Sequence, residues 1–161
     1  MSLIRILRLT LLLSLSSFAF AGADGPDAAL FQQLGADIDG EAQGEDSGWS
    51  VSLSADGTVV AIGATSADGS GSNSGTVRLY SWDGAAWNQL GADIDGEAAN
   101  DRSGYSVSLS ADGTVVAIGA RANDGNSGNP GHDSGHVRLY GWDGAAWNQL
   151  GADIDGEAAN D

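Results

Sequence analysis

The fold of this chain is decided by residues 47–64, which read S-G-W-S-V-S-L-S-A-D-G-T-V-V-A-I-G-A. Trp49, Val51 and Leu53 alternate with serines, which is the period-2 pattern of a strand with one buried face. The A-D-G after them is a turn, because glycine takes a positive φ at no steric cost. The chain then returns through T-V-V-A-I-G-A, which is apolar at both parities, as in an inner strand covered on both faces. The stretch predicts a β-hairpin.

The same stretch recurs at residues 103–120, with tyrosine in place of the tryptophan. Each copy belongs to a longer unit that opens with (F/W)-(Q/N)-Q-L-G-A-D-I-D-G-E-A and closes with S-G-(T/H)-V-R-L-Y-(S/G)-W-D-G-A-A. Internal repeats of this kind set the domain organisation. We predict a signal peptide (1–21), a short N-terminal segment (22–30), a first repeat (31–86), a second repeat (87–146) and part of a third (147–161).

Each repeat carries signals for four short strands and none for a helix. Residues 76–82 alternate again, and Asp83 and Gly84 turn the chain into residues 86–90. A small antiparallel sheet of four strands cannot bury its faces alone, so neighbouring units must stack on it. Units of this size are typical of β-propeller blades, about four to eight of which form a ring. We predict an all-β fold of propeller-type blades, two complete repeats plus the start of a third in a partial ring, and we expect the chain to be a fragment.

The N-terminus has the order of a secretory signal. Arg5 and Arg8 precede an apolar run at residues 9–15, and A-F-A then supplies the small residues that signal peptidase reads. Cleavage is expected after Ala21. The alternative, a membrane anchor, would need about 20 apolar residues. The sequence therefore predicts a secreted or cell-surface protein that does not span the membrane.

The composition narrows the range of partners. The chain has 22 acidic residues against 6 arginines and no lysine, and its net charge is −16. Such a surface repels nucleic acid, so nucleic-acid binding is excluded. There is no cysteine, so disulfides do not stabilise the fold. The acidity could suggest disorder, but the regular spacing of Trp, Val, Ile and Leu argues for a folded domain.

This ordered set of motifs resembles the FG-GAP repeats of integrin-alpha-type β-propellers, in the variant found in secreted and surface proteins of microbes. Residues 47–49 and 103–105 stand near the F-G position, and residues 62–64 and 118–120 stand at the G-A-P position without its proline. The resemblance implies a propeller used for adhesion or recognition. Calcium-binding blades of that family carry a D-x-D-x-D-G loop between these motifs. Here that place holds S-A-D-G-T, and one carboxylate does not make a cage of about six to eight oxygens.

The D-I-D-G-E-A motif is the strongest metal candidate. Alternating carboxylates followed by glycine can surround a hard cation, with backbone carbonyls completing the shell, although the spacing is not that of an EF-hand. The alternative is a solvated acidic turn whose carboxylates accept local backbone N–H bonds. No cofactor is required, and calcium is the one that the motif allows. The candidate ligands are Asp37, Asp39 and Glu41 in the first copy and Asp93, Asp95, Glu97 and Asp101 in the second.

Other residues that could carry chemistry have simpler interpretations. His132 and His136 are spaced i, i+4 but lie in a loop and do not recur, which favours a chance pair over a zinc site. Asp133 and Ser134 beside them make no triad, because a triad is assembled in space. We therefore predict no enzyme activity. The recurring tryptophans could stack on sugars, but repeat-equivalent aromatics favour packing between blades; they are Trp82, Trp87, Trp142 and Trp147.

These observations predict a secreted or cell-surface β-propeller repeat module for binding or adhesion, without its own catalytic site and with a protein or glycan as partner. Two alternatives stay open: a truncated piece of a larger secreted enzyme, and a purely structural surface repeat array. Two blades leave apolar positions uncovered, so self-association through unpaired blade edges is expected. A third blade is expected to pack on Val51, Leu53, Val60, Ile62, Val77 and Leu79, or on their counterparts in the second repeat.

Overall fold

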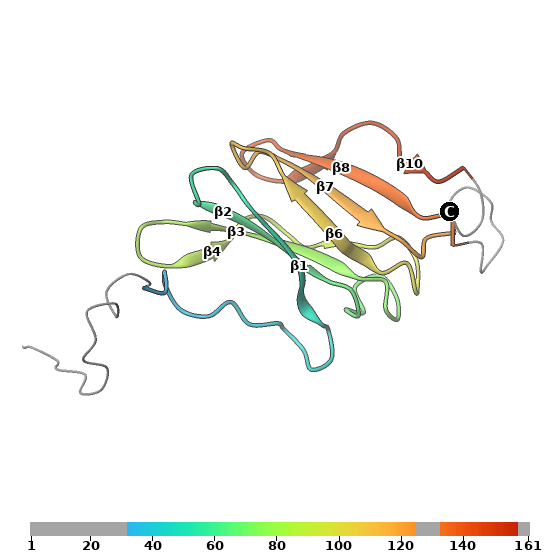
Figure 1. The fold of residues 1–161 in the computed structure, drawn as a ribbon, viewed down its shortest axis with the longest axis horizontal. Coiled ribbons are helices and arrows are strands. Elements are labelled where there is room, and N and C mark those ends of the chain that lie inside the picture. Colours follow the sequence, from blue (N-terminus) through green and yellow to red (C-terminus); the bar gives the residue numbers. More distant parts are fainter. Residues whose placement is uncertain (1–31, 125–132, 158–161) are drawn as a thin grey trace, which may run out of the picture. The chain divides into compact units, whose positions relative to one another are not determined.

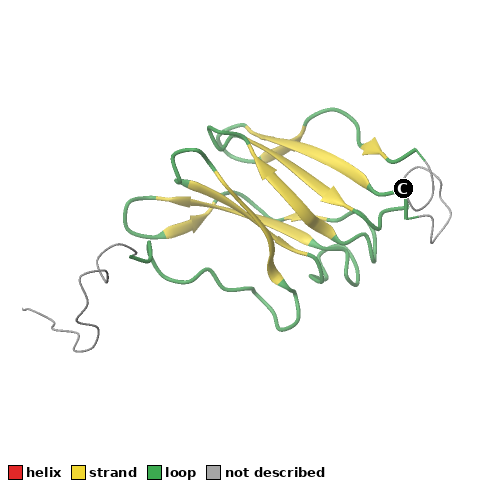
Figure 2. Ribbon diagram, viewed as in Figure 1, coloured by secondary structure: helices red, strands yellow, loops and turns green. Residues whose placement is uncertain are grey.

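The computed structural model describes residues 32–124 and 133–157. The predicted signal peptide with its cleavage site at Ala21, the segment 22–30, His132 and the final residues 158–161 lie outside the described residues. The chain divides into two units, Met1–Gln33 and Leu34–Asp161, and every strand found in the described residues belongs to the second. Its described residues form strands, turns and loops but no helix, which confirms the all-β prediction (Figure 2). The described part of the chain accordingly contains no helix that could cross a membrane.

The strands form two antiparallel sheets with the same topology (Figure 1). The first sheet has the order β1 (Ser47–Leu53), β2 (Val59–Ala64), β3 (Thr76–Trp82) and β4 (Trp87–Gln89), and β5 (Ile94–Asp95) also pairs with β3. The second sheet comprises β6 (Ser103–Leu109), β7 (Val115–Ala120) and β8 (His136–Trp142), with β9 (Trp147–Gln149) and β10 (Ile154–Asp155) both paired with β8. In sequence, β4 and β5 belong to the second repeat, but in space they complete the first sheet.

Local chemistry explains the hairpin between β1 and β2. Asp56 Oδ1 accepts hydrogen bonds from Ser54 Oγ at 2.7 Å and from Thr58 N at 3.0 Å, while Gly57 has φ 74°. These bonds hold the pKa of Asp56 below its usual value of 3.8, and the bond from Ser54 has the largest effect. The same bonds in the second repeat lower the pKa of Asp112 to about 2. The A-D-G stretch is therefore a self-bonded turn that reverses the chain.

The strand register decides which side chains share a face. In the first sheet Val51 pairs with Ile62, so both lie on the face turned away from the second sheet, and Val51 is 63% exposed. Val77 and Leu79 lie on the opposite face, where they are buried. The expectation of one apolar surface that includes all of these residues is wrong, because the antiparallel register places the apolar positions of β1 and β3 on opposite sides.

The core lies between the two sheets. It joins Ala61, Val77, Leu79 and Ile94 of the first sheet to Val116, Ile118 and Tyr140 of the second. The backbones approach so closely that a Cβ on Gly63 would lie 2.2 Å from the carbonyl oxygen of Gly104. Only glycine fits at this position, because any side chain would push the sheets apart. The apolar central strands β2 and β7 therefore both contribute to the core where the two sheets stack face to face.

Candidate metal centre and open sheet face

Arg78 extends from β3 into three carboxylates. Its Nε donates to Asp93 Oδ2 at 2.8 Å, its Nη1 to Glu45 Oε2 at 3.1 Å and its Nη2 to Glu41 Oε2 at 3.1 Å. Burial alone would lower the pKa of Arg78, but the bonds to Glu45 and Asp93 raise it above the usual arginine value. The guanidinium is therefore a permanent cation inside this acidic cluster. Two predicted calcium ligands, Glu41 and Asp93, are already neutralised by it.

The other predicted calcium ligands lie in separate parts of the structure. Asp37 and Asp39 line a small hollow with Tyr80 and Trp87. Asp95 accepts a hydrogen bond from Thr76 Oγ1 at 2.7 Å. The structure thus does not bring the seven predicted ligands into one site.

The second repeat does not reproduce the Arg78 cluster. Arg138 occupies the same place on β8, but its Nη2 donates to the Asp95 carbonyl at 2.8 Å and its Nη1 lies 3.6 Å from Glu97 Oε1. Asp101, which is one methylene shorter, stands in the place of Glu45. Its Oδ2 accepts instead from the backbone N–H of Ala98 at 2.8 Å and from Asn123 Nδ2 at 3.0 Å. The carboxylate that would face Arg138 is thereby engaged elsewhere.

His136 is the unusual residue beside this arginine. It stands where the first repeat has Thr76, and its side chain is buried. Within the part of the chain that the structure describes, neither ring nitrogen has a hydrogen-bond partner, although Nδ1 lies 3.7 Å from Glu97 Oε2. Burial, and then the charge of Arg138, lower the pKa of His136 below 6.5. The imidazole is therefore neutral at neutral pH and keeps a lone pair for a ligand.

Glu97, His136 and Asp153 bring one ligand atom each to within 4.8 Å of one another. The carboxylates of Glu97 and Asp153 also border an acidic hollow. Its other carboxylates come from Asp101, Asp124 and Asp155. The sequence predicted Glu97 as a ligand but not Asp153, and it favoured a chance pair of His136 with His132 over a metal site. The signal that could have identified His136 is the replacement of threonine by histidine at a repeat-equivalent position.

The recurring tryptophans have packing roles. The ring centroids of Trp82 and Trp87 lie 5.4 Å apart, and those of Trp142 and Trp147 are separated by the same 5.4 Å. The indole N–H of Trp87 donates to the carbonyl of Leu34 at 2.9 Å. These contacts favour packing between segments over a platform for sugars.

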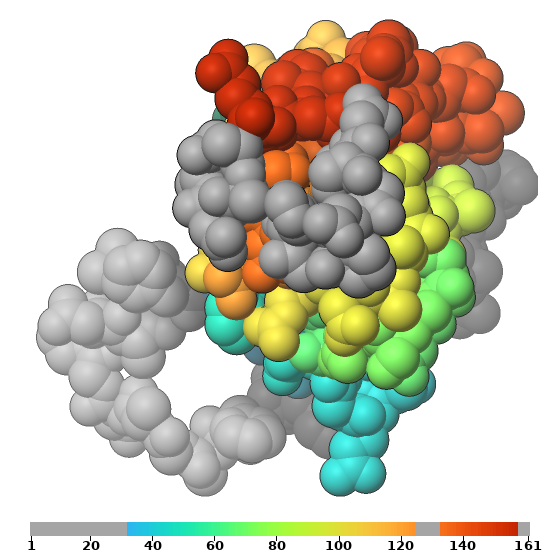
Figure 3. Space-filling model, turned by 90° about the vertical axis from the view of Figure 1, so that its right-hand side faces the viewer, coloured from blue at the N-terminus to red at the C-terminus, as the bar shows by residue number. Residues whose placement is uncertain are grey.

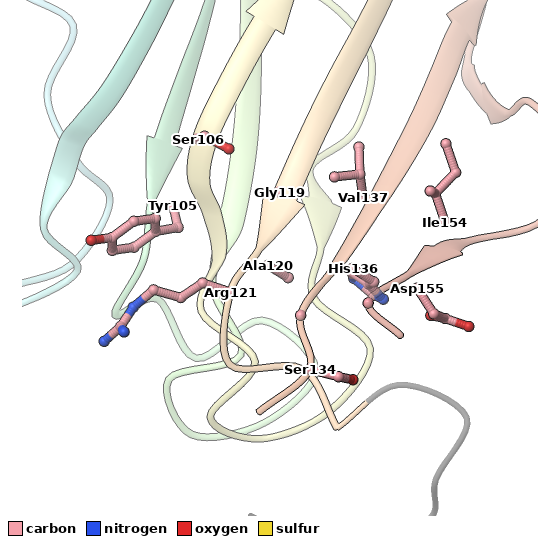
Figure 4. A pocket seen from close by; sticks show the side chains of 12 residues that line it. Tyr105, Ser106, Gly119, Ala120, Arg121, Ser134, His136, Val137, Ile154 and Asp155 are labelled. Atoms are coloured by element: carbon pink, nitrogen blue, oxygen red, sulfur yellow. The ribbon is translucent and has the colours of Figure 1, made fainter. Parts of the chain in front are cut away.

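The face of the second sheet turned away from the first is open and hollowed (Figure 4). Val137 and Ile154 lie along one side of the hollow, and Tyr105 and Arg121 lie at the other. The guanidinium carbon of Arg121 is 4.9 Å from the Tyr105 ring centroid. Figure 3 shows the two repeats following one another across the molecule, from the first repeat in green to the C-terminal strands in red. The open face therefore joins apolar, aromatic and basic groups at the end of the stack.

Comparison with family models and with curated proteins finds no match to this chain. The likeness to FG-GAP repeats therefore rests on the motifs in the sequence. What the chain can bind has to be inferred from its own geometry.

Proposed function

We propose that this chain is a secreted β-propeller-type repeat module that binds a protein or glycan through the open face of the second sheet, without a catalytic site of its own. The observation that carries the proposal is the hollow beside Tyr105, Val137 and Ile154. It combines apolar anchors with an aromatic ring and a guanidinium on a rigid sheet, which is the composition of a recognition surface. The propeller assignment is supported by two sheets of equal topology stacked face to face.

Binding should depend on the centre of this face. We expect Val137→Arg to weaken binding at least about tenfold, because it places a charge where an apolar contact forms on association. The measurement is surface plasmon resonance with the purified secreted chain, against any ligand found on glycan and matrix-protein arrays. Ala145→Arg is the matched control, since Ala145 is exposed in the turn between β8 and β9 and away from the hollow. Equal affinity of the Val137→Arg variant and the wild type would contradict the proposed face.

A second candidate function is binding of a divalent cation by Glu97, His136 and Asp153. The specific observation is the buried imidazole whose nitrogens lack partners among the described residues. One imidazole nitrogen with two carboxylates suits Zn²⁺ or Co²⁺, whereas Ca²⁺ takes oxygen ligands alone. Calcium binding by the D-I-D-G-E motif stays a prediction, and it applies to those of its carboxylates that do not bond to an arginine.

The cation site has a test that leaves the fold intact. His136→Thr restores the residue of the first repeat, so the variant should fold like the wild type. We expect the wild type to bind one Zn²⁺ per chain in calorimetric titration at pH 7, and His136→Thr to bind it at least about tenfold more weakly. Lowering the pH toward 5 should also weaken binding, because protons compete for the imidazole. Unchanged Zn²⁺ affinity in His136→Thr would mean that the acidic surface binds the ion without this site.

A further inference from the structure

We infer that the open face of the second sheet binds the outer face of the first sheet in a second copy of this chain, so that copies associate head to tail. The inference rests on the proposed binding face and names its partner. The acceptor face is defined by Ser106, Ser108, Gly119, Val137 and Ile154. The donor face is defined by Trp49, Val51, Leu53 and Val60.

The contact between the two sheets within one chain is the template for this association. The strand that begins S-G-Y lies against the preceding sheet and is held by hydrogen bonds at several points along its length. They are Ser103 N to the Ser74 carbonyl (2.9 Å), Ser50 Oγ to the Gly104 carbonyl (2.7 Å) and Leu109 N to Ser52 Oγ (2.9 Å). The residues that make these bonds recur in both repeats, and each bond involves a backbone group. A second copy of the chain can therefore make the same bonds to the second sheet.

The acceptor face repeats the groups that receive this strand. Ser106, Ser108 and Ser134 stand where the first repeat has Ser50, Ser52 and Ser74, and Gly119 stands where it has Gly63. The register of β6, β7 and β8 is the same as that of β1, β2 and β3. The second sheet is therefore built to receive a further S-G-(W/Y) strand.

The exposure of equivalent residues shows what the acceptor face lacks. Ile94 and Ile154 lie in the same G-A-D-I-D-G-E sequence and pair with equivalent strands, yet Ile94 is 6% exposed and Ile154 60%. Likewise Val77 is 0% exposed and Val137 36%. The local structure is the same in each pair, so the difference comes from the sheet that covers the first member and not the second.

The donor face is uncovered in a complementary way. Val107 and Leu109 pack against the core, while their equivalents Val51 and Leu53 are exposed. Trp49 and Tyr105 occupy equivalent positions with ring centroids 5.6 Å apart. A docked copy would place its Trp49 against the exposed Tyr105, as Tyr105 lies against Trp49 within the chain.

One segment must move when the faces meet. Residues 34–41, 90–97 and 150–157 all read L-G-A-D-I-D-G-E. Within the chain residues 90–97 contact both sheets: Ile94 lies in the core, and residues 92–95 lie beside Tyr140 and Trp147. The acceptor's copy is held on β8 by the Ile154–Val137 and Asp155–His136 pairs, whereas residues 34–41 form no strand. The donor's segment, which Trp87 holds at Leu34 and Arg78 holds at Glu41, therefore has to be displaced. The acceptor's segment offers the same groups in return: its Glu157 takes the place of Glu41 beside Arg78, and its Leu150 carbonyl takes the place of that of Leu34, as the Leu90 carbonyl already does for Trp147 within the chain.

The chemistry of the two faces favours a second copy over an unrelated partner. The acceptor face carries the serines and the glycine, and the donor face carries the apolar residues, whose equivalents already fit one another inside the chain. The opposing factor is the net charge of −16, which makes copies repel at low ionic strength. At about 0.15 M salt the Debye length is about 8 Å, so the repulsion is screened and the apolar contact can form. Association should accordingly strengthen with salt.

The test uses two variants that block opposite faces. Val137→Arg blocks the acceptor face and Val51→Arg blocks the donor face, and both valines are exposed, so each variant should fold. In sedimentation velocity at 0.15 M salt, we expect the wild type and Ala145→Arg to form larger species with rising concentration, and each blocked variant to stay monomeric. A 1:1 mixture of the two blocked variants should form a dimer and stop there, because one intact donor and one intact acceptor remain, with a change in Trp49 fluorescence.

A wild type that stays monomeric at every concentration, a blocked variant that still self-associates, or a mixture that stays monomeric would overturn the head-to-tail contact. Failure of the proposed function is distinguishable from this. If the mixture dimerises while no array ligand is found, the head-to-tail contact is supported and the proposed binding of another protein or a glycan is contradicted. If array ligands bind while the mixture stays monomeric, the module binds other partners and the second copy is excluded.

Discussion

Replacing Ile94 by alanine is expected to destabilise the fold by about 2–5 kcal/mol, whereas the same change at Ile154 should cost less than about 0.5 kcal/mol. The two isoleucines share their local sequence and their pairing with equivalent strands. Ile94 fills the core between the sheets, and truncation would leave a cavity there, while Ile154 lies on the open face. The difference between the two costs therefore measures the stacking of one sheet on the other.

The measurement is urea unfolding of the secreted chain followed by tryptophan fluorescence. Both substitutions are made in the Val51→Arg background, which blocks the donor face and leaves the cross-strand partners of both isoleucines unchanged, so that association does not stabilise one variant more than the other. Equal costs at the two positions would contradict the stacked arrangement. In the associating wild-type background the cost at Ile154 should rise with protein concentration, because the docked copy buries this side chain.

Arg78→Met is expected to cost about 3 kcal/mol, the lower end of the usual range for removing one partner of a buried ion pair. Methionine keeps most of the apolar stem, but Glu45 and Asp93 would then be left partly buried without a counter-charge. Arg138→Met is the matched control and should cost less. Its ion-pair partner Glu97 is more exposed and lies at 3.6 Å. A larger loss at Arg138 than at Arg78 would show that the carboxylates around Arg78 do not depend on it.

The same cluster predicts how stability depends on pH. Burial alone would raise the pKa of Glu45, but the hydrogen bond and charge of Arg78 outweigh it and hold the pKa below the usual 4.5. A carboxyl whose pKa is lowered in the folded state stabilises the fold above its unfolded value and loses that contribution as the pH falls through the folded value. Stability should therefore decrease below about pH 4.5. Urea melts between pH 7 and 3 should show a smaller loss for Arg78→Met than for the wild type.

Much of the fold could be predicted because its signals are local. The alternation of Trp49, Val51 and Leu53 predicted the strand β1, but not its covered face: these three side chains are exposed, and the serines between them face the second sheet. The A-D-G stretch predicted the turn that Asp56 stabilises. The repeat predicted a second sheet of the same kind. These features depend on residues a few positions apart, and on steric preferences that each segment carries with it.

The candidate site could be predicted only in part, because its members come from distant segments. The D-I-D-G-E motif indicated a cation, and in the first repeat the cation is the guanidinium of Arg78, which donates to Glu41 and Glu45 more than 30 positions away. His136 was set aside as half of a chance pair with His132, because only the pairing of β8 with β10 and the path of the preceding segment bring Asp153 and Glu97 to it.

The sequence by itself determined the strands, their turns and the repetition of one sheet, because alternation and turn chemistry act within a segment. Only the tertiary structure decided which face of each strand is covered, since that depends on register between strands and on stacking between sheets. Val51 and Val77 are the same residue type in strands of the same sheet, yet register exposes one and buries the other. Ile94 and Ile154 are identical even in their neighbours, and the presence of a covering sheet alone separates them.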